Sequence, residues 1–214
     1  SMQVYKEFSI LSSRPNKKEL KQAKHYLYGL ISVKKYFSAG DWLKEAKKKI
    51  NISLKKKKTP IVVGGTGLYF NTIIKGISKI PNIDLKTRSK VRNLFKKLGS
   101  DKFYEELIKL DPKAKNKILA SDSQRTQRAY EVKLKTRKSL FDWIGNTKSD
   151  FSDYDLKKIF IDIPRNELLN NISKRTESMF IQKCTNEVKK FNSIKVDKSL
   201  SANKLIGVQE INSY

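Results

Sequence analysis

One stretch of the chain decides the expected fold: Pro60-Ile61-Val62-Val63-Gly64-Gly65-Thr66-Gly67-Leu68-Tyr69. Its β-branched run predicts a short buried strand, and three glycines within four positions predict a tight loop. The apolar pattern of residues 68–74 then predicts a helix. A strand, a glycine loop and a helix N-terminus would together present several backbone N–H groups, which suits a phosphate or another anion. A strand-to-helix turn that binds nothing explains the same residues.

The segments on either side of this stretch predict an α/β core interrupted by helices. Upstream, Asp41 is expected to cap a helix with apolar residues at a spacing of four: Trp42, Ala46, Ile50 and Leu54. Downstream, residues 158–163 predict another strand, followed by a long helix from Arg165. We therefore expect residues 1–80 and 151–214 to form the two parts of an α/β core, and residues 81–150 an all-helical lobe.

The lobe divides into short helices at recognisable caps. Residues 84–98 and 101–110 each predict a helix, and Asp111-Pro112 predicts the start of a third. Ser121-Asp122-Ser123-Gln124 has the pattern of a capping box and predicts a fourth.

The charge of the chain favours a polyanionic partner. The 214 residues contain 47 Lys and Arg against 21 Asp and Glu, which gives a formal net charge of +26 and a pI near 10.0. Such a field attracts nucleic acids. A lysine-rich background is the alternative, because the lysines are spread along the whole chain.

Cysteine and histidine usage excludes several classes of site. Cys184 is the only cysteine and His25 the only histidine, so a disulfide framework, a zinc site and a serine triad are all implausible. No apolar run approaches the roughly 20 residues that a bilayer requires, and no signal peptide is visible. We expect a cytoplasmic protein without membrane contact.

Two groups of arginines are candidates for anion contacts. Gln124, Arg125 and Arg128 fall in the first turns of the predicted fourth helix, where they suit phosphates and base edges, although a solvated arginine face has the same pattern. Arg175 lies in an apolar ridge with Leu168, Ile172 and Met179. A guanidinium buried there needs a negatively charged partner, which a diphosphate or a structural salt bridge would supply. A side chain that snorkels to the edge of the ridge would explain the same pattern without a ligand. The position of Arg88 in the sequence does not by itself distinguish it from any other surface arginine.

In sequence order, six segments resemble the tRNA dimethylallyltransferase family. They are Ser1-Met2-Gln3-Val4-Tyr5, Phe37-Ser38-Ala39-Gly40-Asp41-Trp42-Leu43, Ile61 to Tyr69, Asp122-x-Gln124-Arg125-x-x-Arg128-Ala129-x-Glu131-Val132, Arg165 to Met179 with Arg175, and Ile206-Gly207-Val208-Gln209-Glu210. The resemblance covers nearly the whole chain and implies a P-loop NTPase-like core, a parallel sheet with flanking helices, that carries the helical lobe.

The resemblance also implies an activity. The family transfers a dimethylallyl group from dimethylallyl diphosphate to the N6 amine of the adenosine 3′-adjacent to the anticodon of tRNA. By resemblance Arg175 would bind the diphosphate, and Thr66, also a catalytic candidate, would lie beside the target nucleotide with Ser1, Met2 and Gln3. The anticodon stem-loop would be contacted by a larger set: Arg88, Gln124, Arg125, Thr126, Gln127 and Arg128, and by residues 205–210. Magnesium would accompany the diphosphate, and the protein would be a monomer.

Two departures from the family pattern affect the expected activity. The chain contains no Gly-x-x-x-x-Gly-Lys-Ser/Thr loop, and the family's general-base aspartate would stand immediately before Ser1. The chain also ends short of the family's basic C-terminal segment. We therefore expect this to be a fragment that is inactive by itself. An adenylate isopentenyltransferase acting on free nucleotides and a non-enzymatic RNA-binding module are the alternatives.

Overall fold

The computed structural model describes residues 1–197 and 200–213, which form two compact units. The first unit contains Ser1–Thr72 and Leu156–Tyr214, and the second contains Ile73–Asp155. The second unit therefore includes all of residues 81–150. None of the described helices is long and apolar enough to cross a membrane.

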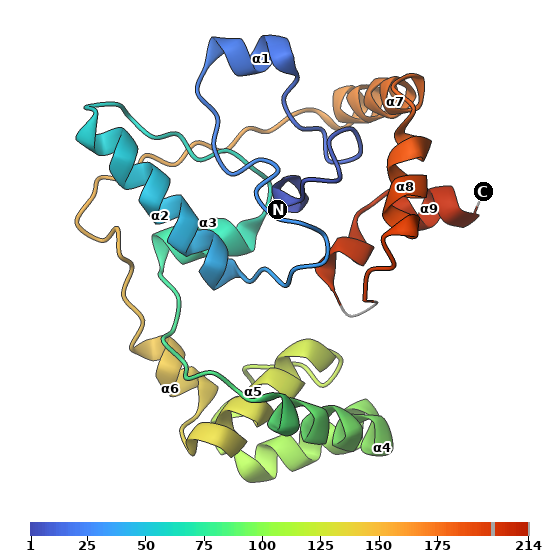
Figure 1. Cartoon of the computed structure of the whole chain (residues 1–214). Helices are drawn as coiled ribbons and strands as arrows, with labels where there is room; N and C mark the ends of the chain where they lie inside the picture. Colours follow the sequence, from blue (N-terminus) through green and yellow to red (C-terminus); the bar gives the residue numbers. More distant parts are fainter. Residues whose placement is uncertain (198–199, 214) are drawn as a thin grey trace. The chain divides into compact units, whose positions relative to one another are not determined.

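The first unit is built from helices joined by long irregular segments (Figure 1). Its elements are η1 (Met2–Val4), α1 (Lys17–Gln22), α2 (Ala39–Lys55), α3 (Gly67–Ile74, whose last two residues fall in the second unit), α7 (Arg165–Ile181), α8 (Cys184–Ser193), η3 (Ser201–Lys204) and α9 (Val208–Ser213). Phe8 is fully buried and packs against Phe191 of α8, with ring centroids 4.9 Å apart. Val188 and Val208 add buried apolar surface from α8 and α9.

The expected α/β core is wrong for this structure. The described residues form no sheet, and their β-pairing is limited to one isolated parallel bridge between Tyr5 and Ile31. Residues 158–163 are extended but exposed, as the 86% exposure of Ile159 and the 89% exposure of Phe160 show. The P-loop NTPase-like parallel sheet is therefore not observed.

The physical reason for this error lies in how strands are stabilised. β-Branched runs show that a segment suits an extended conformation, but a strand exists only when a neighbour completes its hydrogen-bond ladder. Among the described residues no ladder partner faces residues 60–66 or residues 158–163. Apolar pattern alone could not reveal that.

The second unit consists of α4 (Leu85–Leu110), η2 (Pro112–Ala114), α5 (Ser123–Thr136) and α6 (Leu140–Gly145), with α4 against α5 (Figure 1). Its core includes Leu107, Ala114, Ile118 and Ala129. Phe103 joins the two long helices, because its ring lies 5.2 Å from that of Phe95 and 5.1 Å from that of Tyr130.

The cap expected for α4 is confirmed, and those expected for α2 and α5 are corrected. α5 is capped by Asp122, whose side chain accepts from Arg125 N–H, and not by Ser121 in a capping box. Asp84 caps α4 by accepting a hydrogen bond from the Thr87 backbone N–H, and α4 is kinked at Gly99, where φ is +74°. The two helices expected over residues 84–98 and 101–110 are therefore confirmed: the label α4 spans both, and the non-helical backbone of Gly99 separates them. In α2 the expectation is corrected: Ser38 is the N-cap, and Asp41 is the reciprocal partner within the capping box.

Candidate functional site

The glycine segment is an open extended stretch that leads into α3. Thr66 accepts hydrogen bonds at its carbonyl from Tyr69 N–H at 3.0 Å and Phe70 N–H at 3.3 Å, and this starts the helix. A Cβ placed on Gly64, Gly65 or Gly67 would meet no atom within 4 Å. The glycines are thus not required by packing against the described chain. They leave accessible backbone beside the N-terminus of α3, as an anion site requires.

Thr66 lies beside the start of the chain. Its Oγ1 accepts a hydrogen bond of 3.1 Å from the Ser1 amino group, although the two residues are 65 positions apart. Ser1, Gln3 and Thr66 all line one cleft of about 620 Å³ in the first unit, and Met2 does not line it. Three of the four residues expected beside the target nucleotide are therefore brought together.

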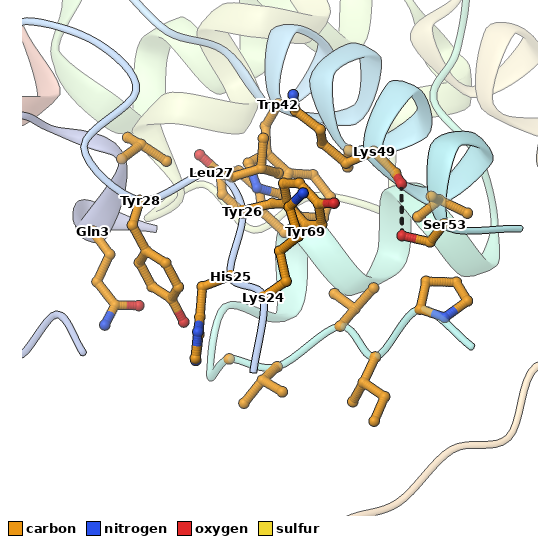
Figure 2. Close-up of a pocket in the computed structure, with 18 of the residues that line it drawn as sticks. Gln3, Lys24, His25, Tyr26, Leu27, Tyr28, Trp42, Lys49, Ser53 and Tyr69 are labelled. Carbon is orange, nitrogen blue, oxygen red and sulfur yellow. Dashed lines mark hydrogen bonds between the residues drawn. The ribbon is translucent and has the colours of Figure 1, made fainter. Parts of the chain in front are cut away.

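Figure 2 shows an aromatic wall in this cleft. Trp42 of α2 and Tyr69 of α3 stack with ring centroids 4.3 Å apart and an interplanar angle of 13°. Burial raises the pKa of Tyr69 to about 12, so its phenol is neutral at physiological pH. Tyr26 lies nearby under Lys49, whose Nζ is 5.5 Å from the ring centroid. This wall offers flat apolar surface to an unsaturated hydrocarbon or a base.

The charges that line the cleft are all positive. Lys24, Lys49, Lys56 and Lys58 contribute ammonium groups, and no aspartate or glutamate is among the lining residues. The backbone groups of residues 24–28 and 60–65 have no hydrogen-bond partner within the described chain. Lysines without acids, together with free backbone N–H groups, favour an anionic ligand.

The loop that supports Gln3 is held by a carboxylate that sequence reasoning missed. Glu187 of α8 accepts hydrogen bonds from Ser9 N–H and Ser9 Oγ–H at 2.7 Å, from Ile10 N–H at 2.9 Å and from Leu11 N–H at 3.0 Å. The same loop binds Gln3, whose Nε2 donates to Ser13 O at 2.9 Å. Because Glu187 follows the loop by about 180 positions, no local pattern could have joined them.

The expectation that Arg175 is buried in an apolar ridge is wrong. α7 has no buried residue, Leu168 is 43% and Ile172 is 39% exposed, and Arg175 itself is exposed. Arg175 does not line the cleft with Thr66. The desolvation argument for an anion at this position therefore does not apply, and the diphosphate role stays a prediction from resemblance.

The predicted RNA-contacting residues of the second unit have different environments. Gln124 and Arg125 are exposed at the start of α5. Arg128 is half-buried and bonded to Glu131 at 3.4 Å. Thr126 is fully buried, and its hydroxyl bonds to carbonyl groups of its own helix, so its side chain is not at the surface.

The remaining two residues of this set also have constrained polar groups. Gln127 donates from Nε2 to Ser123 O at 2.9 Å. Arg88 is half-buried on α4, and its Nε has no hydrogen-bond partner in the described chain. This N–H is itself shielded from solvent, so it does not support a contact with an acceptor outside the unit, and the RNA contact of Arg88 stays a prediction from resemblance.

Magnesium, which the resemblance implies, finds no prepared side-chain site. The described residues contain no group of three or more His, Cys, Asp or Glu that could hold a metal ion. These residues therefore offer no metal cage made of side chains alone, and we derive no chemical step through a metal.

Comparison with known proteins decides the family. A family model described as IPP transferase matches residues 3–214. The chain belongs to the IPP transferase family. The tRNA dimethylallyltransferase of Pelagibacter ubique (strain HTCC1062) is 51% identical over 214 residues, a match that covers 100% of this chain and 68% of that protein. The tRNA dimethylallyltransferase of Wolbachia pipientis wMel is 38% identical and is covered over 71% of its length.

Two solved structures are similar to this chain in fold. The tRNA isopentenylpyrophosphate transferase of Bacillus halodurans matches with a TM-score of 0.63 and 26% identity, over 100% of this chain and 66% of that one. A eukaryotic dimethylallyltransferase acting on tRNA matches with a TM-score of 0.79 and 22% identity, over 100% of this chain and 55% of that one. The second match shows likeness of fold alone.

Proposed function

We propose that this IPP transferase modifies tRNA, by transferring a dimethylallyl group from dimethylallyl diphosphate to the N6 amine of the adenosine 3′-adjacent to the anticodon. The observation that carries the proposal is the meeting of Ser1, Gln3 and Thr66 at one cationic cleft with an aromatic wall. Family membership supplies the reaction class, and the cleft supplies a place where an anion, an apolar group and a base could meet.

The reaction makes specific demands on the protein. The N6–C bond forms while the C–O bond to diphosphate breaks, the amine loses a proton and the diphosphate leaves with its negative charge. Because an adenine amine is a weak nucleophile, its orientation is essential. Thr66 and Gln3 are proposed to orient the base, and the lysines of the cleft would oppose the developing charge. Magnesium would accompany the diphosphate without dedicated carboxylate ligands.

Arg175 is proposed as an additional diphosphate contact. Its guanidinium has no ion-pair partner among residues 1–197 and 200–213, so it is available to a ligand. We expect Arg175→Gln to raise KM for dimethylallyl diphosphate and to leave stem-loop affinity unchanged. The matched control is Lys174→Gln, which removes one exposed charge from the same helix.

The proposal is tested by comparing two acceptors. The chain is joined to an N-terminal segment that supplies a Gly-x-x-x-x-Gly-Lys-Ser/Thr loop and the aspartate, and is given dimethylallyl diphosphate with either AMP or a tRNA anticodon stem-loop. We expect modification of the stem-loop and not of AMP, and no transfer by the 214 residues alone. Modification of AMP in preference would show a free-nucleotide enzyme, and binding of the stem-loop without any transfer would show an RNA-binding module. We expect the protein to act as a cytoplasmic monomer.

A further inference from the structure

A groove of about 300 Å³ lies between α4 and α5 of the second unit, and its residues have no role in the proposed reaction. The residues that line it are Lys90, Val91, Asn93, Leu94 and Lys97 of α4, and Tyr130 and Leu134 of α5. Helical spacing places positions 90, 94 and 97 on one face of α4, and 130 and 134 on one face of α5. Val91 is fully buried and Leu94, Tyr130 and Leu134 are half-buried, so the floor is apolar and aromatic.

The first part of α4 is cationic and unpaired, and Lys90 and Lys97 bring this charge to the groove. Residues 85–98 contain six basic residues and no acidic one: Lys86, Arg88, Lys90, Arg92, Lys96 and Lys97. None of the six forms an ion pair with a described residue, whereas Lys109, Lys113 and Lys135 of the same unit each do. Unpaired cations along one helix repel each other, and a polyanion that replaces their counterions relieves this repulsion.

We propose that this groove binds an unpaired base of an RNA loop, with the phosphates on either side of that base held by Lys90 and Lys97. The inference rests on the proposed function, because it names a second contact for the same stem-loop. The two lysines are seven residues apart, which is about 10 Å along a helix axis. They therefore stand at opposite ends of the groove, where flanking phosphates would lie.

The floor of the groove favours a base over a phosphate alone. A flat heterocycle gains contact with the Tyr130 ring and with the Leu94 and Leu134 side chains. Stacking of a base on an aromatic side chain contributes about 1–3 kcal/mol in single-strand binding sites. Asn93 is exposed at the rim and can donate or accept at the edge of a base. Duplex RNA keeps its bases stacked and paired, so it could use only the lysines.

The test measures affinity of the 214-residue chain for two RNAs of equal phosphate number, an anticodon hairpin with an unpaired loop and a blunt duplex. Lys90→Gln/Lys97→Gln removes the proposed phosphate contacts. Lys115→Gln/Lys148→Gln removes two exposed charges of the same unit outside the groove and is the matched control. Asn93→Phe fills the groove without changing charge.

We expect Lys90→Gln/Lys97→Gln to weaken hairpin binding about tenfold and to reduce the slope of log K against log salt by about 1.4, since each single-strand phosphate contact contributes about 0.7. The control should weaken it less than about threefold. Asn93→Phe should weaken the hairpin and leave the duplex unchanged. Equal losses in the two double variants, or an unchanged hairpin affinity in Asn93→Phe, would overturn the groove. Failure of the unaltered chain to bind the hairpin would instead overturn the proposed function.

Discussion

Replacing Glu187 by alanine should loosen the loop that supports the proposed nucleotide site. The carboxylate accepts four hydrogen bonds of 2.7–3.0 Å from residues 9–11, and three of the donors are backbone N–H groups. Those of Ile10 and Leu11 are part-buried, and each costs about 1–3 kcal/mol when left without a partner. Ser9 is exposed, and its donor groups can hydrogen-bond to water instead. We therefore expect the free energy of unfolding of the first unit to fall by about 3 kcal/mol.

Urea denaturation measures this loss in the unit concerned. The two tryptophans, Trp42 and Trp143, lie one in each unit, so a Trp143→Phe background makes the fluorescence report on the first unit alone. With a slope of about 2 kcal/mol per molar urea, the midpoint should fall by about 1.5 M. Glu187→Gln, which retains one carbonyl acceptor, should lose about half as much.

The control for this experiment is Glu177→Ala. Glu177 is exposed on α7 and its carboxylate has no hydrogen bond among the described residues, so its removal should change stability by less than about 0.5 kcal/mol. If Glu187→Ala and Glu177→Ala shift the midpoint equally, the carboxylate does not hold the loop, and the link from α8 to Gln3 is refuted.

Three further predictions concern other parts of the chain. Gly29 has a φ of +56°, a conformation that costs an L-residue about 1–2 kcal/mol, so Gly29→Ala should lower stability by about that amount in urea denaturation. Gly64→Ala, which adds a Cβ in open space, should be nearly neutral. The Lys135 ammonium, followed by the Thr87 backbone N–H, holds the pKa of Asp84 well below its usual range. The contribution of the Asp84 carboxylate to stability is therefore present near neutral pH and is lost as the pH falls below about 4. Between pH 7 and pH 3 the Asp84→Asn variant should lose less stability than the unaltered chain, and an equal loss would contradict this. In the N-terminally extended protein, Arg128→Ala should weaken stem-loop binding and leave the affinity for dimethylallyl diphosphate unchanged. Folding is checked by circular dichroism, because Glu131 loses its ion-pair partner. Unchanged stem-loop affinity would contradict the role of Arg128.

The helical parts of the fold could be predicted from sequence because their determinants are local. Asp84 caps α4 through a side chain that accepts from the backbone N–H three residues ahead, and this is visible as a pattern. The pattern of residues 121–124 correctly indicates a helix start, but the cap is Asp122 and not Ser121. The buried face of α5, with Ala129 and Val132, also follows from spacing. The break inside α4 could also be predicted, because Gly99 lies between two separate helix signals.

The absence of strands among the described residues and the exposure of Arg175 could not be predicted, because strand pairing and burial both depend on partners far away in the sequence. Residues 158–163 have strand composition, yet a strand needs a neighbour that composition does not name. Arg175 has ridge spacing, but spacing identifies a face and not what covers it; α7 leaves that face exposed. The meeting of Ser1 with Thr66 was expected only through family resemblance, since no local pattern links residues 65 positions apart.

The most direct test of the account is where the target adenosine lies when RNA is bound. An anticodon stem-loop carrying a photoreactive azidoadenosine 3′-adjacent to the anticodon is bound to the chain, irradiated and mapped by peptide mass spectrometry. We predict labelling within residues 1–4 or 60–69, the two segments that contribute Ser1, Gln3 and Thr66 to the cleft. Labelling confined to α7 or to the helical unit would contradict it.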